Sequence, residues 1–343
     1  MSAPTITERI EHRRERLHLA VGTECNNNCM FCIEADRAGR RASNATMTPE
    51  RVRSILEKHR GVEEVCFTSG EPTTRPDLAI LVRRARELGF RTVSIMTNGR
   101  RLAYPGYAAS LAAAGITRFC ISIHGHDRRL HEGLTRTPGS FAQTVAGLDE
   151  VARLRPGGVE LHTSSVVTTR NLPHLLELYR FLRSHGADQV VLNVMQATGR
   201  AEQHFERIFP RYRDVVGAFS ALLAAIDEPQ PMVFLVDVPL CLTEAVPDFN
   251  RGFVERQFHY DARPGAVDGP SGSDGDAAVL LVTRDDLDRA ERRKRAECST
   301  CRYDPVCEGV WRAYLEHRGW AEFVPVVDPR PSGRALDTPQ SGR

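Results

Sequence analysis

Short apolar runs alternate with longer amphipathic stretches over the first 200 residues. Runs rich in β-branched residues predict strands at 17–22, 64–70, 91–99, 116–125, 158–168 and 188–196. The spacing of apolar positions between these runs predicts helices at 48–59, 76–89, 107–115, 140–154 and 171–186. Thr48 followed by Pro49 is a typical helix start, and Gly89 is a typical helix end. Because the connections are short, the pattern predicts a parallel sheet with right-handed crossovers.

Six strand–helix units predict an α/β fold, a partial (β/α)6 TIM-like barrel that no terminal pair closes. A flat doubly wound sheet is the alternative. In either fold, reactive groups belong at the carboxyl ends of the strands. Four polar segments lie at such ends: CNNNCMFC at 25–32, SGEPT at 69–73, TNG at 97–99 and HGH at 124–126. The sequence therefore predicts one active face.

The second half of the chain follows another pattern. It predicts, in order, a helical bridge at 204–226, a strand at 231–241, a mobile Gly/Asp-rich loop at 261–276, a short strand at 278–283 and a charged helix at 284–297. The expected division is a basic arm (1–16), the barrel (17–200), the helical bridge (201–240), a small cysteine-bearing domain (241–328) and a disordered tail (329–343).

Composition and charge narrow the class of protein. Of 343 residues, 41% are hydrophobic and 26% are charged, which is typical of folded domains. Lys and Arg number 46 against 44 Asp and Glu, a net charge of +2 that argues against a nucleic-acid partner, and the basic run at 8–16 is expected to be a solvated arm. No apolar stretch reaches the ~18 residues of a membrane span, and no signal core is present. We expect a cytoplasmic protein without a membrane partner.

Nine cysteines in a reducing compartment indicate metal or redox chemistry rather than disulfides. Cys66 and Cys120 stand alone in apolar runs and are expected to be small buried hydrophobes. Cys25, Cys29 and Cys32 form one tight loop, whose asparagines can turn the backbone and donate hydrogen bonds to sulfur. Three thiolates leave one iron of a four-iron cluster open, whereas structural zinc needs a fourth ligand. The spacing favours a cluster over zinc.

CNNNCMFC after the first strand and SGEPT after the second resemble the CxxxCxxC and GGEP motifs of the radical S-adenosylmethionine (SAM) superfamily, with Ser69 replacing the first glycine. The resemblance spans about 16–200. It implies that Cys25, Cys29 and Cys32 bind a [4Fe–4S] cluster whose open iron is chelated by SAM. One electron then cleaves SAM to methionine and a 5′-deoxyadenosyl radical, which abstracts a substrate hydrogen. A donor such as flavodoxin or ferredoxin would supply the electron.

The resemblance also implies residues around SAM. They are Phe31, Gly70, Glu71, Pro72, Thr97, Asn98, Ser122, His124 and Arg136. Phe31 matches an aromatic position near the adenine, the SGEPT residues 70–72 would hold the methionyl amino group, and 97–98 face the same rim. Ser122 and His124 would reach the ribose or the substrate, and Arg136 would pair with the SAM carboxylate. For these last three, ordinary loop capping is the alternative.

Four later cysteines form a second candidate site: Cys241 and the C-x2-C-x5-C pattern of Cys298, Cys301 and Cys307. Four thiolates complete either a zinc site or a cluster, and the residues alone leave both open. On a radical SAM barrel the pattern resembles the SPASM/twitch extension, in its one-cluster twitch form. The resemblance implies an auxiliary [4Fe–4S] cluster that accepts an electron from the substrate radical.

We therefore predict a radical SAM oxidoreductase that oxidises or cross-links a peptide, as a maturase of ribosomally made peptides does, or a small biosynthetic intermediate. A leader-peptide-binding protein would have to be a separate chain, because only about 16 residues precede the first strand. Two alternatives stay open. One is a radical SAM enzyme that modifies RNA, which the net charge disfavours. The other is a non-catalytic iron–sulfur or zinc protein, which the two intact motifs disfavour.

Overall fold

The fold was analysed in a computed structural model. It describes residues 16–33, 47–196, 198–228, 232–246, 249–250, 259–262, 281–283, 291–305 and 307–327. The predicted disordered tail, most of the basic arm and of the mobile loop, and the first part of the charged helix lie outside these residues. Among the described residues, no helix combines the length and apolarity needed to cross a membrane.

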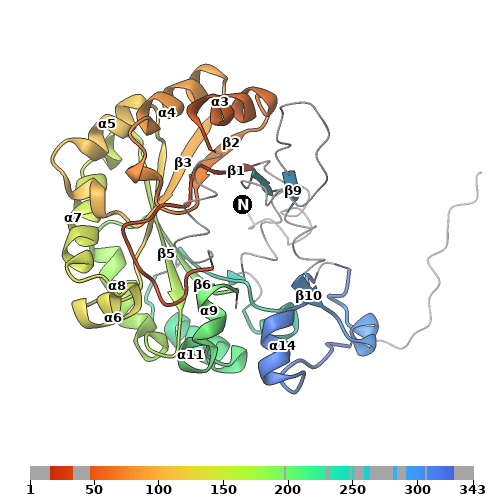
Figure 1. The fold of residues 1–343 in the computed structure, drawn as a ribbon. Helices are drawn as coiled ribbons and strands as arrows, with labels where there is room; N and C mark the ends of the chain where they lie inside the picture. The colour runs from red at the N-terminus through yellow and green to blue at the C-terminus, as the bar shows by residue number, and fades with distance from the viewer. Residues whose placement is uncertain are drawn as a thin grey trace, which may run out of the picture.

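A nine-stranded sheet with the order β7-β6-β5-β4-β3-β2-β1-β8-β9 forms the centre of the fold (Figure 1). Its strands are β1 (Arg16–Ala20), β2 (Glu64–Thr68), β3 (Thr92–Thr97), β4 (Arg118–Ser122), β5 (Glu160–Val167), β6 (Gln189–Val194), β7 (Val233–Val236), β8 (His259–Ala262) and β9 (Leu281–Thr283). Strands β1 to β7 are parallel neighbours in chain order. This order has no switch point, so the partial-barrel prediction is confirmed over the doubly wound alternative, with a seventh strand added.

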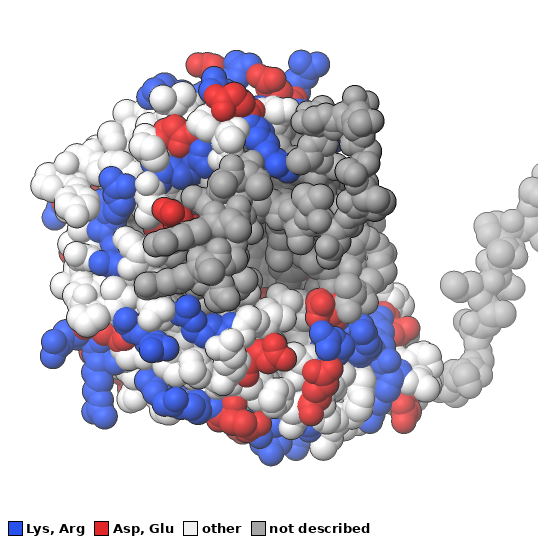
Figure 2. Space-filling view, in the orientation of Figure 1, with Lys and Arg blue, Asp and Glu red and all other residues white. Residues whose placement is uncertain are grey.

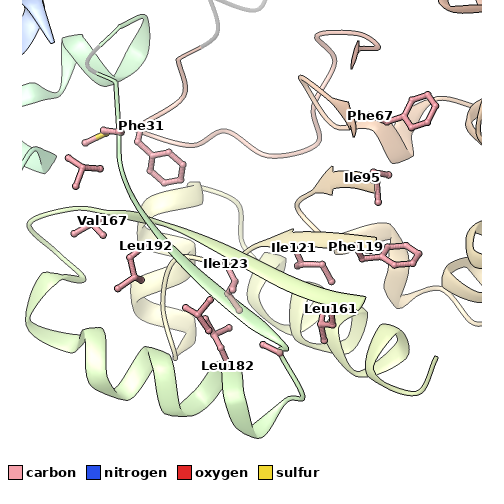
Figure 3. Packing of buried hydrophobic residues seen from close by; sticks show 14 of the residues in the cluster. Phe31, Phe67, Ile95, Phe119, Ile121, Ile123, Leu161, Val167, Leu182 and Leu192 are labelled. Atoms are coloured by element: carbon pink, nitrogen blue, oxygen red, sulfur yellow. The ribbon is translucent and has the colours of Figure 1, made fainter. Parts of the chain in front are cut away.

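Helices line the outside of the curved sheet (Figure 1). The α-helices that follow β1 to β5 are α3 (Pro49–Lys58), α4 (Leu78–Glu87), α5 (Tyr107–Ala114), α6 (Arg128–Thr135), α7 (Ser140–Ala152) and α8 (Leu175–Ser184). Figure 3 shows part of the apolar layer beneath them, with Leu161 of β5, Leu192 of β6 and Leu182 of α8 in one cluster. Thr48 caps α3 as predicted, accepting a hydrogen bond from the Arg51 amide.

Helix α6 lies where the sequence suggested only a loop. The Asp127 side chain caps it by accepting a hydrogen bond from the Leu130 amide at 2.8 Å. The helix is eight residues long and buries Leu134, His131 and Thr135 on one face. Two of these three are polar, so the apolar periodicity that marks a helix is weak here. This explains why the sequence did not predict it.

The bridge after β6 consists of three short helices, α9 (Arg200–Gln203), α10 (Phe205–Ile208) and α11 (Tyr212–Ala224). The predicted single helical segment at 204–226 is interrupted because Pro210 cannot donate a backbone hydrogen bond within a helix. The next segment, β7, joins the barrel sheet by pairing with β6. The barrel therefore extends past its predicted end.

Two predictions in the last third of the chain differ from the structure at the residues that it describes. The helix expected at 284–297 is not formed at its end, where β10 (Arg292–Arg293) pairs antiparallel with β11 (Val310–Trp311) and the 3-10 turn Ala296–Thr300 follows. The loop expected from 261 begins with the last residues of β8, which pairs parallel with β1. Helix α14 (Arg312–Arg318) follows β11. Both errors come from pairing between distant segments, which local periodicity does not encode.

Candidate functional site

The cysteine loop at 25–32 follows β1 and is supported by two elements from the other side of the barrel mouth. Backbone carbonyls at the end of α6 accept hydrogen bonds from loop amides, Asn28 to Thr135 at 3.0 Å and Met30 to Leu134 at 2.9 Å. Arg200, at the start of α9, donates to the Asn28 side chain at 2.6 Å and to the Cys29 carbonyl at 3.0 Å. These bonds fix the loop across the mouth of the sheet.

A second arginine holds the loop from the β3 side. Arg100, in the turn η2 (Arg100–Ala103), donates to the Asn26 carbonyl and to the Asn27 side chain. Asn98, at the end of β3, donates to the Asn26 side chain at 2.6 Å and lies 3.9 Å from the Cys25 sulfur. The Asn27 amide also points to that sulfur, at 3.4 Å. Within the loop, Asn27 thus donates to the Cys25 sulfur through its backbone amide, and Asn98 approaches the same sulfur from the end of β3.

Arg100 and Arg200 are site residues that sequence reasoning missed. The sequence does carry a signal, because each directly follows a glycine after a strand, Gly99 after β3 and Gly199 after β6. In a Gly-Arg pair at a strand end, the glycine can turn the chain so that the long, positively charged arginine side chain lies over the site. Their targets lie more than 70 residues away, which no local pattern reveals.

The three thiols of the loop are close enough to affect one another's ionisation. Burial raises the pKa of the Cys29 thiol, and the charges of Cys25 and Cys32 raise it further, while the nearby Arg200 cation opposes this. A cationic metal centre would be needed to hold these cysteines as thiolates. Three thiols from one loop, with backbone and side-chain donors at the Cys25 sulfur, have the composition of an iron–sulfur site.

The SGEPT segment packs directly against the cysteine loop. Gly70 has a φ of +56°, and a Cβ placed there would lie 2.5 Å from the Glu24 carbonyl oxygen. The Glu71 amide donates to that same oxygen at 2.7 Å. Ser69 also has a positive φ, of 72°, which is costly for a residue with a side chain. Gly70 is therefore needed for contact between two loops of the site.

The Glu71 carboxylate is fully engaged with protein donors. One oxygen accepts from the Thr73 amide at 3.1 Å and from the Thr97 hydroxyl, and the other accepts from the Asn98 amide at 2.6 Å. Burial raises the pKa of this carboxyl, while these hydrogen bonds lower it. The side chain thus joins the ends of β2 and β3. The methionyl amino group assigned to this segment by resemblance would therefore meet backbone at Gly70 and Pro72.

A cavity of about 300 Å³ opens where the loops after β1 and β2 meet the start of α3. Its lining includes Gly22 and Glu24 from the cysteine-loop segment, and Ser69, Glu71 and Pro72 from SGEPT. The cavity belongs to the same rim as the cysteine loop. It gives this side of the site room for a small polar ligand.

His124 is held as a neutral hydrogen-bond donor. Its Nδ1 accepts from the Val166 amide at 3.1 Å, so the neutral ring carries its proton on Nε2. Burial, and then the neighbouring His131, lowers the pKa of His124 well below its ordinary value. Phe31 of the cysteine loop packs edge-on against the ring, with centroids 4.5 Å apart. His124 therefore links the end of β4 to the loop.

The remaining predicted residues lie around this centre. Ser122 is half-buried at the end of β4, in register with Ser164 of β5. Arg136 caps α6 with a left-handed backbone (φ 50°) and an exposed side chain. His126 lies near His124, but the described residues include no group of three or more His, Cys, Asp or Glu side chains arranged to hold a metal ion. This holds for the histidines of this rim and, as they are placed here, for both sets of cysteines.

The four later cysteines surround one pocket. Its lining is Pro239, Cys241, Arg293, Lys294, Cys298, Cys301, Asp304, Cys307, Gly309, Val310, Trp320, Phe323 and Pro325. Burial raises the pKa of Cys241 to about 12, and the charges of the other three cysteines contribute. The Gly309 amide donates to the Cys307 sulfur at 3.4 Å, and the Val326 amide donates to the Cys301 sulfur at 3.3 Å. By its composition, this donor set suits a thiolate-bound metal centre.

Comparison with known proteins is consistent with this geometry. Residues 19–182 match the radical SAM superfamily. An AdoMet-dependent heme synthase of Methanosarcina barkeri is 28% identical over 184 residues, 53% of this chain and 51% of that protein. A probable GTP 3′,8-cyclase of Methanopyrus kandleri is 35% identical over 164 residues, 47% of this chain and 51% of that protein. The chain thus spans about half the length of these curated relatives.

Solved structures resemble a larger part of the chain. Streptococcus suis SuiB bound to the precursor peptide SuiA has a TM-score of 0.63 and 17% identity, covering 92% of this chain and 75% of that one. The enzyme anSMEcpe with bound AdoMet and a peptide has a TM-score of 0.55 and 14% identity, covering 88% and 89%. At these identities the likeness is one of fold.

Proposed function

Because residues 19–182 form a radical SAM domain, we propose that the protein is a radical SAM enzyme that oxidises or cross-links a peptide, with a second cluster in the four-cysteine pocket as electron acceptor. The proposal includes the division into barrel (17–200, extended by β7), the rest of the bridge (201–240) and the cluster-bearing domain (241–328). It also includes an external electron donor and a separate protein that binds the leader of the peptide.

One observation carries the proposal: Cys241 lines a single pocket together with Cys298, Cys301 and Cys307, which follow it more than 50 residues later. A half-buried pocket with four thiols and backbone donors to two of them has the composition of a closed cluster site. A closed site has no open iron for a substrate, so it suits electron transfer. A centre that removes one electron complements one that abstracts one hydrogen atom, because together they make a two-electron oxidation.

When bound, a [4Fe–4S] cluster and SAM at the three-cysteine loop supply a 5′-deoxyadenosyl radical for hydrogen abstraction. The chain's own residues position this chemistry. Arg100 and Arg200 fix the loop, and Glu71 holds Thr97 and Asn98 at its rim. His124 presents a neutral N–H donor that stays uncharged at neutral pH. A neutral donor can orient a polar group without protonating it.

Support for a peptide substrate comes from the extent of the fold likeness. The likeness to SuiB, whose structure holds a precursor peptide, covers nearly the whole chain, whereas the heme synthase and cyclase relatives match about half of it. An RNA substrate has less support. On the face in Figure 2, basic and acidic side chains are interspersed, and its described part forms no continuous basic stripe.

The test begins with anaerobic reconstitution, iron and sulfide analysis, and EPR of the reduced protein with and without SAM. Two clusters correspond to about eight irons per chain, falling to about four in a Cys25/Cys29/Cys32→Ala variant. 5′-Deoxyadenosine would then be measured with three kinds of substrate: precursor peptides encoded nearby, GTP and a porphyrin. A peptide that loses two hydrogen atoms per 5′-deoxyadenosine supports the proposal. Turnover of GTP or porphyrin without peptide turnover would overturn the peptide assignment.

A further inference from the structure

Arg292, in β10, is a buried cation beside the four-cysteine pocket. Its side chain is 2% exposed, and it pairs with Asp237 at 2.8 Å and with Glu308 at 3.2 Å. Its guanidinium lies 3.8 Å from the centre of the Trp311 ring and donates to the Gly309 carbonyl at 3.4 Å. A buried charge is costly unless it is fully paired, so this set of contacts is specific.

These contacts connect the segments that carry the cysteines. Asp237 has a left-handed backbone (φ 62°) directly after β7, four residues before Cys241. Glu308 directly follows Cys307, and the amide of the next residue, Gly309, donates to the Cys307 sulfur. Arg292 itself precedes the segment that holds Cys298 and pairs with β11. One guanidinium therefore fixes the approach to Cys241, the turn at Cys307 and the strand that leads to Cys298.

The ion pairs also set the charge near the pocket. Two carboxylates, Asp237 and Glu308, lie close to cysteines, and Arg292 neutralises one of their two negative charges. Arg293 and Lys294 line the pocket itself, and without Arg292 these two carboxylates would lose their buried partner beside it. Negative charge stabilises the oxidised state of a cluster and lowers its reduction potential. A centre that accepts electrons requires the opposite effect.

We propose that Arg292 is the positioning residue of the four-cysteine centre: its paired guanidinium assembles the cysteine segments, and its charge raises the reduction potential of the bound cluster. This inference rests on the proposed function, because it requires a cluster at these cysteines. The two effects separate experimentally. Assembly depends on the geometry of the guanidinium, whereas the potential depends on its charge.

Three variants test the inference, each in the Cys25/Cys29/Cys32→Ala background so that only the later centre contributes iron. Arg292→Met removes geometry and charge, Arg292→Lys keeps the charge, and Arg292→Met/Asp237→Asn/Glu308→Gln removes the cation together with both anions. Arg312→Met is the control, because Arg312 forms exposed ion pairs in the same region. The readouts are iron per chain, EPR of the reduced cluster and its midpoint potential, with circular dichroism for the fold.

We expect Arg292→Met to reduce the iron from about four to about two per chain, and the retained clusters to have a lower midpoint potential. Arg292→Lys should lose less iron and keep the wild-type potential. The triple variant should lose iron like Arg292→Met and keep a potential close to wild type. Arg312→Met should change neither. Full iron and an unchanged potential in Arg292→Met would overturn the inference.

Misfolding and failure of the proposed function give different results. If Arg292→Met unfolds, Arg292→Lys and the triple variant decide: equal iron in both would contradict the role in assembly, and a changed potential in Arg292→Lys would contradict the role of the charge. A Cys241→Ala/Cys307→Ala variant reports on the cluster itself. If it loses no iron, no cluster is bound there and the proposed function is wrong. If it loses iron while the Arg292 variants match wild type, only the role of Arg292 is wrong.

Discussion

The two cysteine centres are built in opposite ways. The first takes all its cysteines from one eight-residue loop, and arginines that follow β3 and β6 contact that loop mostly through its backbone and asparagines. The second combines Cys241 with three cysteines from a segment more than 50 residues later, and a buried arginine joins the two segments through ion pairs. The three cysteines of the loop are close in sequence, so the fold only has to hold the loop in place. The four later cysteines come together only when the fold brings two segments side by side.

Removing the cysteines of each centre separately gives the largest expected effect. Cys25/Cys29/Cys32→Ala should abolish 5′-deoxyadenosine formation, because no SAM-binding iron remains. Cys298/Cys301/Cys307→Ala should still form 5′-deoxyadenosine but no oxidised product. Both are measured by chromatography after anaerobic incubation with SAM and reductant. Equal loss of 5′-deoxyadenosine in the two variants would contradict the separate roles.

Gly70→Ala should damage the first centre while leaving the second intact. The new Cβ would meet the Glu24 carbonyl oxygen, in a backbone conformation that alanine disfavours. We expect a loss of roughly 3 kcal/mol in the free energy of unfolding and a depleted first cluster. Urea unfolding and iron analysis measure this. Gly61→Ala is the matched control, since nothing lies within 4 Å of a Cβ there; a similar loss in both would contradict the packing argument.

Arg200→Met should weaken the first centre through its support alone. The variant removes the hydrogen bonds to the Asn28 side chain and the Cys29 carbonyl but no ligand. By analogy with other residues that orient metal ligands, we expect SAM cleavage to slow about 10- to 100-fold. Arg207→Met, an exposed change on the neighbouring helix α10, should have little effect. If both variants behave alike, the loop does not depend on Arg200.

Lowering the pH should destabilise helix α6, which supports the first centre. Burial, aided by Arg100, lowers the pKa of His131 to about 4. The unfolded chain therefore binds a proton near pH 6.5 that the folded chain does not bind until about pH 4, so stability falls as the pH drops between these values. The loss is roughly 3 kcal/mol from this residue. Urea unfolding at several pH values gives the free energy of unfolding as a function of pH. Its slope should be shallower for His131→Leu than for Arg129→Ala, an exposed change on the same helix.

The same contrast explains what the sequence could predict. Local periodicity marks the barrel strands, and spacing marks the cysteine loop and SGEPT. The structure places these two loops at one end of the sheet. Arg100, Arg200 and Arg292 each contact at least one partner more than 50 residues away, which no local pattern encodes. The charged helix expected at 284–297 failed for this reason. The sequence predicted a charged helix there, whereas Arg292 lies in β10 and is buried in ion pairs.

The pairing of β8 with β1 has a consequence for dissecting the protein. The chain returns from the β7 end of the sheet and covers the edge of its first strand. A fragment that stops after β7 would keep every residue of the three-cysteine loop, yet it would expose the backbone N–H and C=O groups of β1. Open edges of this kind recruit strands from other molecules. A fragment that stops after β7 should therefore self-associate at its β1 edge. Experiments on the barrel should use the whole chain.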